Sequence, residues 1–234
     1  MVQIIESSPL GLRSARLTLE NENPSVSFTL YPMIHLGEIS YYETIEKELA
    51  EHDLVLVEGV KSPIVSRITS SYRWAAAAPA LGLILQSSVF RDTVDGQRVI
   101  HADLKQDEFE AYWRRVPLWL RFFAFVLAPY IGFKRRFSAS RKDFADGMSM
   151  NDIASRDEIL SWDARFDSFY HAILHARDQR LVEVIAENLD TPKQGIQRIA
   201  VVFGARHMRA VIDYLTAERG YRVASGSWLT VFRL

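Results

Sequence analysis

The chain has no cysteine, almost no net charge and no long uninterrupted hydrophobic run. The absence of cysteine excludes disulfide bonds, thiolate metal ligands and a cysteine nucleophile. A formal net charge of −1 at pH 7 argues against a nucleic-acid-binding protein held by a broad basic surface. The most apolar stretch, Phe122 to Phe133, is interrupted by Pro129 and is shorter than the roughly 20 residues that a membrane-spanning helix needs.

Several motifs that would identify an enzyme class or an export route are also missing. There is no Gly-x-Ser-x-Gly elbow, which argues against a serine esterase. Gly204 has no glycine-rich run and no following Lys-Ser/Thr, so its segment is a poor match to a phosphate-binding loop. The N-terminus lacks a basic region followed by a long apolar run; we therefore expect no signal peptide and a cytoplasmic location.

The chain does contain the alternation of strand and helix patterns that is typical of an α/β fold. Strands are predicted at 13–20, 25–30, 54–57, 98–101, 199–203, 221–223 and 228–232, and the first two and the last two of them each predict a hairpin. Helices are predicted at 38–51, 63–70, 74–86, 106–115 and 206–219 and within 151–188. We therefore predict a single α/β domain over residues 1–234, with a mixed central sheet flanked by helices and a helical subdomain inserted at about residues 105–190.

Four strand-like segments run directly into side chains that could bind a metal. They lead to His35, to Glu58, to His101 with Asp103, and through a glycine turn to His207. In an α/β sheet, ligands and catalytic groups gather in the crevice beyond the carboxyl ends of the strands. The four segments therefore predict one site.

Each of these residues also has a simpler structural interpretation. Glu58 continues a buried strand and needs a charge partner, which is either a metal or an arginine such as Arg177. His35 could be a half-buried histidine hydrogen-bonded to a loop. Asp103 could cap the following helix, and we favour that cap for one of His101 and Asp103 without deciding which.

The segment 117–142 places a basic run after an apolar one. Its basic residues are Lys134, Arg135, Arg136, Arg141 and Lys142. One interpretation is a lid that makes peripheral membrane contact, because apolar faces flanked by cations bind anionic interfaces. The other, which we favour, is a buried helix followed by a solvated basic loop.

The order of these motifs resembles the TraB–PrgY–TIKI family, in the wider group of erythromycin esterase and ChaN-like proteins. The resemblance rests on anchors scattered from about Met33 to Tyr221, namely His35, Val57-Glu58, the predicted helix with Leu81-Gly-Leu-Ile-Leu-Gln86, Ala102-Asp103, Arg177-Asp178 and Gly204-Ala-Arg-His207. The late Gly-x-x-His motif is intact, whereas the early one has Pro32 where the family usually has Gly. The resemblance implies a metal-dependent hydrolase; some members are described as metalloproteases and others as regulators of signalling peptides.

We therefore predict a metal-dependent hydrolase that acts on a peptide, an amide or another small molecule. His35, Glu58 and His207 are the predicted metal ligands, with His101 as a further candidate. Two imidazoles and a carboxylate leave a coordination position open for water. The ion would be manganese, cobalt or zinc, because no thiolate is present.

Four further residues are assigned to the chemistry. We expect Glu38 or Asp103 to act as general base, and Arg206 or Arg177 to stabilise the oxyanion. The alternative function is a non-catalytic regulatory protein of the same fold that binds a peptide, a lipid or a haem-like ligand, which the aromatic region 112–137 favours. The strand at 228–232 has two possible positions: it could pair with another subunit in a homo-oligomer, or it could be an internal edge of the sheet.

Overall fold

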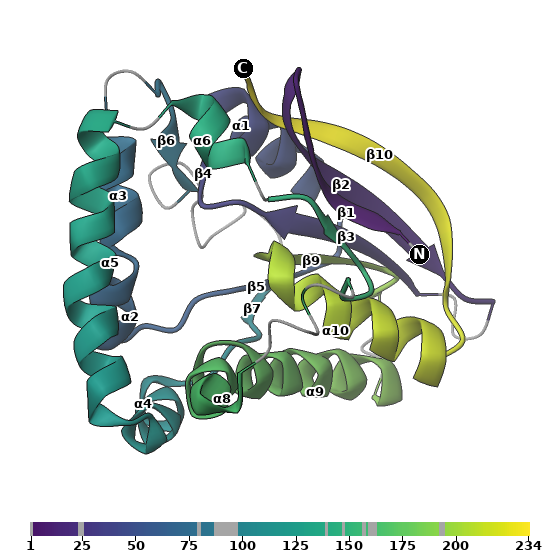
Figure 1. Cartoon of the computed structure of the whole chain (residues 1–234). Coiled ribbons are helices and arrows are strands. Elements are labelled where there is room, and N and C mark those ends of the chain that lie inside the picture. The colour runs from purple at the N-terminus through teal and green to yellow at the C-terminus, as the bar shows by residue number, and fades with distance from the viewer. Residues whose placement is uncertain are drawn as a thin grey trace.

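The computed structural model is organised around a mixed central sheet (Figure 1). It describes residues 2–22, 26–78, 81–86, 98–138, 140–146, 148–155, 158, 163–191 and 195–234. The strands of the sheet are β1 (Gln3–Ser8), β2 (Gly11–Glu20), β3 (Ser27–Met33), β5 (Leu54–Val57), β7 (Arg98–His101), β8 (Met150–Asn151), β9 (Arg198–Gly204) and β10 (Arg222–Arg233). Within the described residues these eight strands have the order β7-β5-β9-β3-β2-β1-β8, with β10 paired to β2. The predicted α/β class is confirmed.

The strands that lead to the predicted site form the parallel half of this sheet. β3, β9, β5 and β7 are parallel neighbours, with Met33 opposite Gly204 and with Val57 opposite both Val202 and His101. β5 and most of β9 are buried on both faces, as their continuous apolar sequences favour. Because parallel strands end at one edge, the residues that follow all four strands are brought to the same side of the molecule.

The antiparallel half is built on β2. β2 pairs with β3, so the predicted opening hairpin is confirmed. β10 is one continuous strand that follows β2 from Glu20 to Gly11, so the predicted closing hairpin at 221–223 and 228–232 is wrong. The turn-prone residues 225–227 stay extended because they pair with β2, and register shifts on both sides of them absorb the mismatch.

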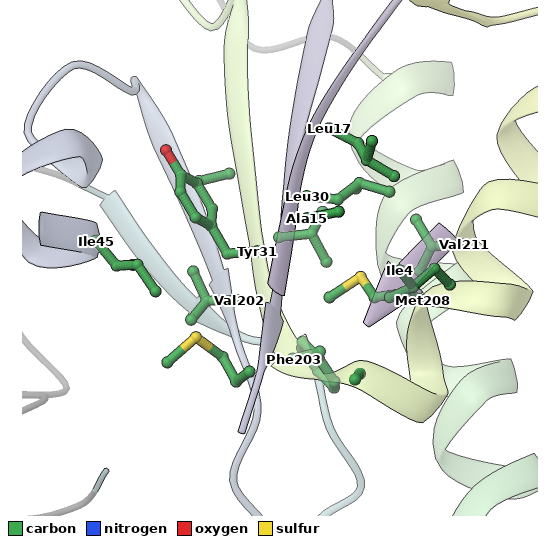
Figure 2. Close-up of a cluster of buried hydrophobic side chains, with 14 of the residues drawn as sticks. Ile4, Ala15, Leu17, Leu30, Tyr31, Ile45, Val202, Phe203, Met208 and Val211 are labelled. Carbon is green, nitrogen blue, oxygen red and sulfur yellow. The ribbon is translucent and has the colours of Figure 1, made fainter. Parts of the chain in front are cut away.

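Helices cover both faces of the sheet. They are α1 (Ile39–Leu49), α2 (Pro63–Ile68), α3 (Ser70–Ala76), α4 (Gln106–Arg115), α5 (Leu118–Ser138), α6 (Arg141–Ala145), α8 (Asp167–Tyr170), α9 (Ala176–Asp190) and α10 (Met208–Asp213). Figure 2 shows Ile45 of α1 beside Tyr31 on one face, and Met208 and Val211 of α10 near Leu30 on the other. The side chains of neighbouring residues in one strand thus pack against helices on opposite faces of the sheet, as the two-residue period of a strand requires.

Residues 105–190 are mainly helical but do not all pack in one place. α4 and the start of α5 enclose a second hydrophobic cluster that includes Phe109, Trp113 and Leu120. α9 instead places Leu181 and Ile185 in the core of the sheet. The last helix of the predicted insertion is therefore part of the α/β layers.

Two helical predictions between the strands differ from the structure. The predicted helix 74–86 ends early, because α3 stops at Ala76 and Ile84–Leu85 form strand β6, paired with β4 (Leu36–Gly37). Gly82, with φ of 56°, adopts a left-handed conformation that a helix interior does not contain. The high alanine content of residues 74–86 is therefore a poor guide to where the helix ends.

The favoured interpretation of the segment 117–142, a buried helix followed by a basic loop, is also wrong. α5 continues to Ser138 and packs against α2 and α3, and at its start one of its faces is exposed to solvent. The exposed apolar residues are Leu118, Trp119, Phe122, Phe123, Val126, Leu127 and Tyr130, each at least 46 % exposed; we call them the α5 face. Among the described helices, none combines the length and apolar character that a membrane crossing requires.

Candidate functional site

Glu58 is the central carboxylate at the carboxyl edge of the parallel strands. It follows β5 directly, and its side chain is 15 % exposed. Its Oε1 accepts a hydrogen bond from Nη2 of Arg177 at 2.6 Å, and its Oε2 accepts one from the backbone N–H of Gly204 at 2.5 Å. A Cβ atom on residue 204 would lie 3.1 Å from that Oε2, so glycine allows the end of β9 to approach the carboxylate. Glu58 is therefore held between helix α9 and a neighbouring strand end.

Arg177 of α9 joins Glu58 to Asp103. Its Nε and Nη2 donate to the two carboxylate oxygens of Asp103 at 3.0 and 2.6 Å, a two-point ion pair. Nη1 donates to the carbonyl of Ile173 at 3.3 Å. The arginine partner proposed for Glu58 is confirmed by this geometry, and the guanidinium is committed to two carboxylates at once.

Asp103 does not have the capping role that we favoured for one of His101 and Asp103. The N-cap of α4 is Lys105, whereas Asp103 is buried and accepts the backbone N–H groups of Gly59 and Leu104 at 3.0 and 2.8 Å. With both its oxygens bound to Arg177 as well, Asp103 orients the site and has no free oxygen with which to take a substrate proton.

The charges around Glu58 determine its protonation state. Burial alone would raise its pKa, but the charge of Arg177, together with the electrostatic influence of His207 and His35, outweighs burial and lowers the pKa of Glu58 to about 2. Burial likewise opposes the charge of Arg177, whose pKa is nevertheless raised by Glu58 and Asp103. Glu58 is therefore an anion throughout the physiological pH range and cannot supply a proton there.

His207 is held by a second carboxylate, that of Asp178. The Nδ1 of His207 lies 2.6 Å from Oδ1 of Asp178, and the histidine is 4 % exposed. Since a carboxylate accepts, the proton is on Nδ1 and Nε2 has a free lone pair. Nε2 lies 3.8 Å from Oε1 of Glu58. Asp178 follows Arg177 on α9, so consecutive residues hold the carboxylate and the imidazole of the site.

The local chain explains this placement of His207. β9 ends at Gly204, and a 3₁₀ turn over Ala205–His207 leads into α10. The turn leaves the imidazole edge-on to Phe203, with ring centroids 5.7 Å apart. His207 was expected in the first turn of a helix, and it immediately precedes α10.

His35 is oriented in a similar way. Its Nδ1 lies 3.3 Å from the amide oxygen of Gln86, and its ring packs on Tyr72 with a centroid distance of 4.8 Å. Because the Gln86 oxygen accepts, Nδ1 carries the proton and Nε2 is left as an acceptor. The pairing of β4 with β6 places Gln86 beside His35, and its backbone N–H donates to the His35 carbonyl at 3.0 Å.

The remaining predicted residues lie in three different places. Arg206 is exposed and lines a cavity at the site, and His101 is exposed and lines a second cavity. Glu38 is not among the residues that line either cavity; it precedes α1 and forms an ion pair with Arg141 at 2.6 Å. The structure therefore gives no support to Glu38 as general base.

Two cavities meet at this group of residues. The first, of about 300 Å³, is lined mainly by apolar side chains and ends at His35, Glu58, Arg177 and His207. The second, of about 530 Å³, also contains His35, Glu58 and Arg177 in its wall. Cavities of this size with a few convergent polar groups are typical of small-molecule sites.

The site fits a divalent cation in its chemistry but not in its present arrangement. His35 and His207 each have Nδ1 bound to an oxygen and Nε2 free, which is how metal-binding histidines are usually held. Glu58, the third predicted ligand, has both oxygens engaged by Arg177 and Gly204. Within the described part of the chain, no group of three or more His, Asp or Glu side chains is placed to hold an ion. The three-ligand centre stays a prediction.

Comparisons with known proteins do not extend this picture. No protein-family model, no curated protein and no solved structure matches the chain. The resemblance to the TraB–PrgY–TIKI family therefore stays a prediction, and the function has to be argued from the geometry of the site.

Proposed function

We propose that the protein is a hydrolase that cleaves an amide or ester bond, with His207 as its general base. The observation that carries this proposal is the pair of half-buried Asp178 and buried His207, in which the free Nε2 of His207 lies beside Glu58 at the end of a cavity. An imidazole that a carboxylate holds in one tautomer is the arrangement that general-base catalysis requires. The site contains no candidate nucleophile of the serine-elbow type, so water is the proposed attacking group.

The proposed reaction uses the side chains as they are placed. Nε2 of His207 takes a proton from water while the water oxygen bonds to the substrate carbonyl carbon, and the same proton then passes to the leaving nitrogen or oxygen. The carboxylates of Asp178 and Glu58, at 2.6 and 3.8 Å from the ring nitrogens, stabilise the imidazolium that forms in between.

The charge that develops on the carbonyl oxygen needs a positive partner. Of the two arginines predicted for this role, Arg177 is committed to Glu58 and Asp103, whereas Arg206 is exposed in the wall of the first cavity. We therefore assign the stabilisation of the oxyanion to Arg206 and treat Arg177 as a residue that positions Glu58 and Asp103.

The predicted metal dependence uses the same atoms in another way. Nε2 of His35, Nε2 of His207 and Oε1 of Glu58 would hold the ion, and when bound it would lower the pKa of water and polarise the carbonyl. A ligated His207 Nε2 has no lone pair left for a proton, so the two mechanisms exclude each other. Exhaustive chelation separates them: the general-base mechanism keeps its turnover, and the metal mechanism loses it until manganese, cobalt or zinc is restored.

The first experiment is a turnover assay on a panel of peptides, N-acyl amino acids and simple esters. We expect His207→Gln and Asp178→Asn to lower kcat about 10²- to 10⁴-fold, the range typical of general-base removal. Asp190→Asn is the matched control, because Asp190 lies on the same helix in an exposed pair with Arg219. Unchanged turnover in both site variants would disprove the role of His207, and ligand binding without any turnover would favour the regulatory alternative.

We further propose that the protein makes peripheral contact with an anionic membrane through the α5 face. The α5 face is apolar and exposed, and Lys134, Arg135 and Arg136 continue the same helix. Arg114 and Arg115 are exposed at the end of α4, just before α5. An apolar face with cations near both of its ends is the pattern that binds anionic lipid surfaces. Homo-oligomer formation stays a prediction.

A further inference from the structure

Two cavities of opposite character open on the same catalytic wall. The residues that both cavities share are His35, Glu58, Tyr72 and Arg177. A molecule that passes this wall would have one part in each cavity and its central bond beside the site. The two cavities therefore describe the two halves of a substrate, an inference that rests on the proposed hydrolase function.

The first cavity suits an apolar group of moderate size. Away from the catalytic wall its lining is dominated by side chains such as Phe144, Met148, Ile173, Leu174 and Phe232. Its volume of about 300 Å³ lies at the lower end of small-molecule sites. A mainly apolar lining favours a hydrocarbon chain or ring over a peptide backbone, because buried peptide groups need hydrogen bonds.

The second cavity carries an excess of positive charge. Lys61 and Arg73 are exposed and line it, and Arg73 donates to the hydroxyl and carbonyl of Ser66. Within the described part of the chain, neither cation forms an ion pair with a carboxylate. Among the described residues of this wall the one carboxylate is Glu58, which is already paired with Arg177.

We propose that the substrate is an amphiphile in which a hydrolysable bond joins an apolar acyl group to an anionic group. The acyl group occupies the first cavity, and the anionic group lies against Lys61 and Arg73 in the second. The chemical class that meets these conditions is an N-acyl amino acid or an acyl ester of an anionic alcohol. Hydrolysis adds water across the bond, leaving a fatty or aromatic acid in the first cavity and an anionic amine or alcohol in the second.

The test compares three probes that differ in one half at a time. They are N-octanoyl-glutamate, N-octanoyl-glutamine amide, which lacks the anionic charges, and N-acetyl-glutamate, which lacks the long acyl chain. We expect kcat/KM to fall at least tenfold when either half is removed. Equal kcat/KM for all three probes, or no turnover of any of them beside turnover of a peptide or a simple ester, would overturn the inference and leave the proposed hydrolase intact.

Variants in each cavity test where the two halves of the substrate bind. The double variant Lys61→Gln, Arg73→Gln should raise KM about tenfold for N-octanoyl-glutamate and leave the constants for the neutral amide unchanged. Met148→Gln should weaken turnover of the octanoyl probes but not of N-acetyl-glutamate. Lys47→Gln with Arg222→Gln is the matched control, because both cations are exposed and line neither cavity. An equal loss for charged and neutral octanoyl probes in the first double variant would exclude the anion-binding role.

Discussion

Glu58 shows how one buried charge can serve stability and chemistry together. Its side chain is only 15 % exposed, yet the neighbouring Arg177 guanidinium keeps the carboxylate ionised. An ionised group whose pKa is lower in the folded than in the unfolded state stabilises the fold above its unfolded pKa, and that stabilisation disappears as the pH falls through the folded pKa. For Glu58 the loss spans the interval from about pH 4.5 to about pH 2.

We expect Glu58→Gln to lower the free energy of unfolding at pH 7 by about 3 kcal/mol, the size that such a pKa difference implies. The variant should also lose less stability than the wild type between pH 4.5 and pH 2, because it has no proton to bind there. Chemical denaturation at stepped pH measures both effects. Glu183→Gln, at an exposed pair with Arg180, is the control. Parallel stability curves for the wild type and the Glu58 variant would show that Glu58 is not the group that titrates.

At the scale of single residues, the sequence predicted where the site residues lie better than it predicted which side chains they contact. The placement of His35, Glu58 and His207 at strand ends followed from local patterns, because each continues an apolar run. The contacts that orient them did not, because Gln86 reaches His35 only through the pairing of β4 with β6. Asp178 entered only through the motif Arg177-Asp178, and its bond to His207 crosses 29 residues.

At the scale of elements, the turn between β1 and β2 depends on a close backbone approach. Gly11 has φ of 139°, and a Cβ atom there would lie 2.2 Å from the carbonyl oxygen of Phe232 in β10. Backbone atoms cannot yield as a flexible side chain can, so any larger residue must displace one strand from the other. The start of the β2–β10 pairing therefore requires glycine.

We expect Gly11→Ala to lower the free energy of unfolding by about 3 kcal/mol, combining a strained φ with an overpacked contact. Gly226→Ala is the matched control on the other strand: its added Cβ would meet the flexible end of Leu17 at 3.2 Å, and φ at that position is not in the left-handed region. Thermal denaturation of both variants measures the difference. Equal melting temperatures would mean that the turn adjusts without cost.

Elements with a strong local signal were predicted and those defined by distant partners were not. The helix at 38–51 and the strand at 54–57 correspond to α1 and β5, because spacing and apolar content suffice to define them. β10 was predicted as two short strands since Ser225, Gly226 and Ser227 resemble a turn in isolation. Only the long edge of β2 explains why they remain extended.

At the scale of the whole molecule, the α5 face departs from an ordinary solvated surface. Helix α5 lies at the side of the fold (Figure 1). It exposes large apolar residues along successive turns, although its other face packs against α2 and α3. Contiguous exposed apolar surface of this kind usually marks a contact site. The molecule that binds the α5 face determines whether the protein acts at a lipid surface.

We expect the protein to sediment with vesicles that contain phosphatidylserine and not with vesicles of phosphatidylcholine alone, and binding should weaken as salt is raised. Phe122→Glu with Val126→Glu should reduce the bound fraction about tenfold, because both charges would have to enter the apolar interface. Thr44→Glu, at an exposed position of α1, is the control. Salt-independent binding to both vesicle types, or a dimer that only the α5 double variant dissociates, would contradict an anionic lipid surface as the partner.

The continuous pairing of β10 with β2 also has a consequence for synthesis on the ribosome. β2 is made well before the strand that covers one of its edges, which contains residues 222–233. The neighbouring strand β9, between β3 and β5, likewise begins only at residue 198. A nascent chain therefore carries unpaired strand edges, which are prone to associate with other chains, until almost all of these residues have emerged. Rapid completion of the chain, or a chaperone that shields β2, would protect the protein during that interval.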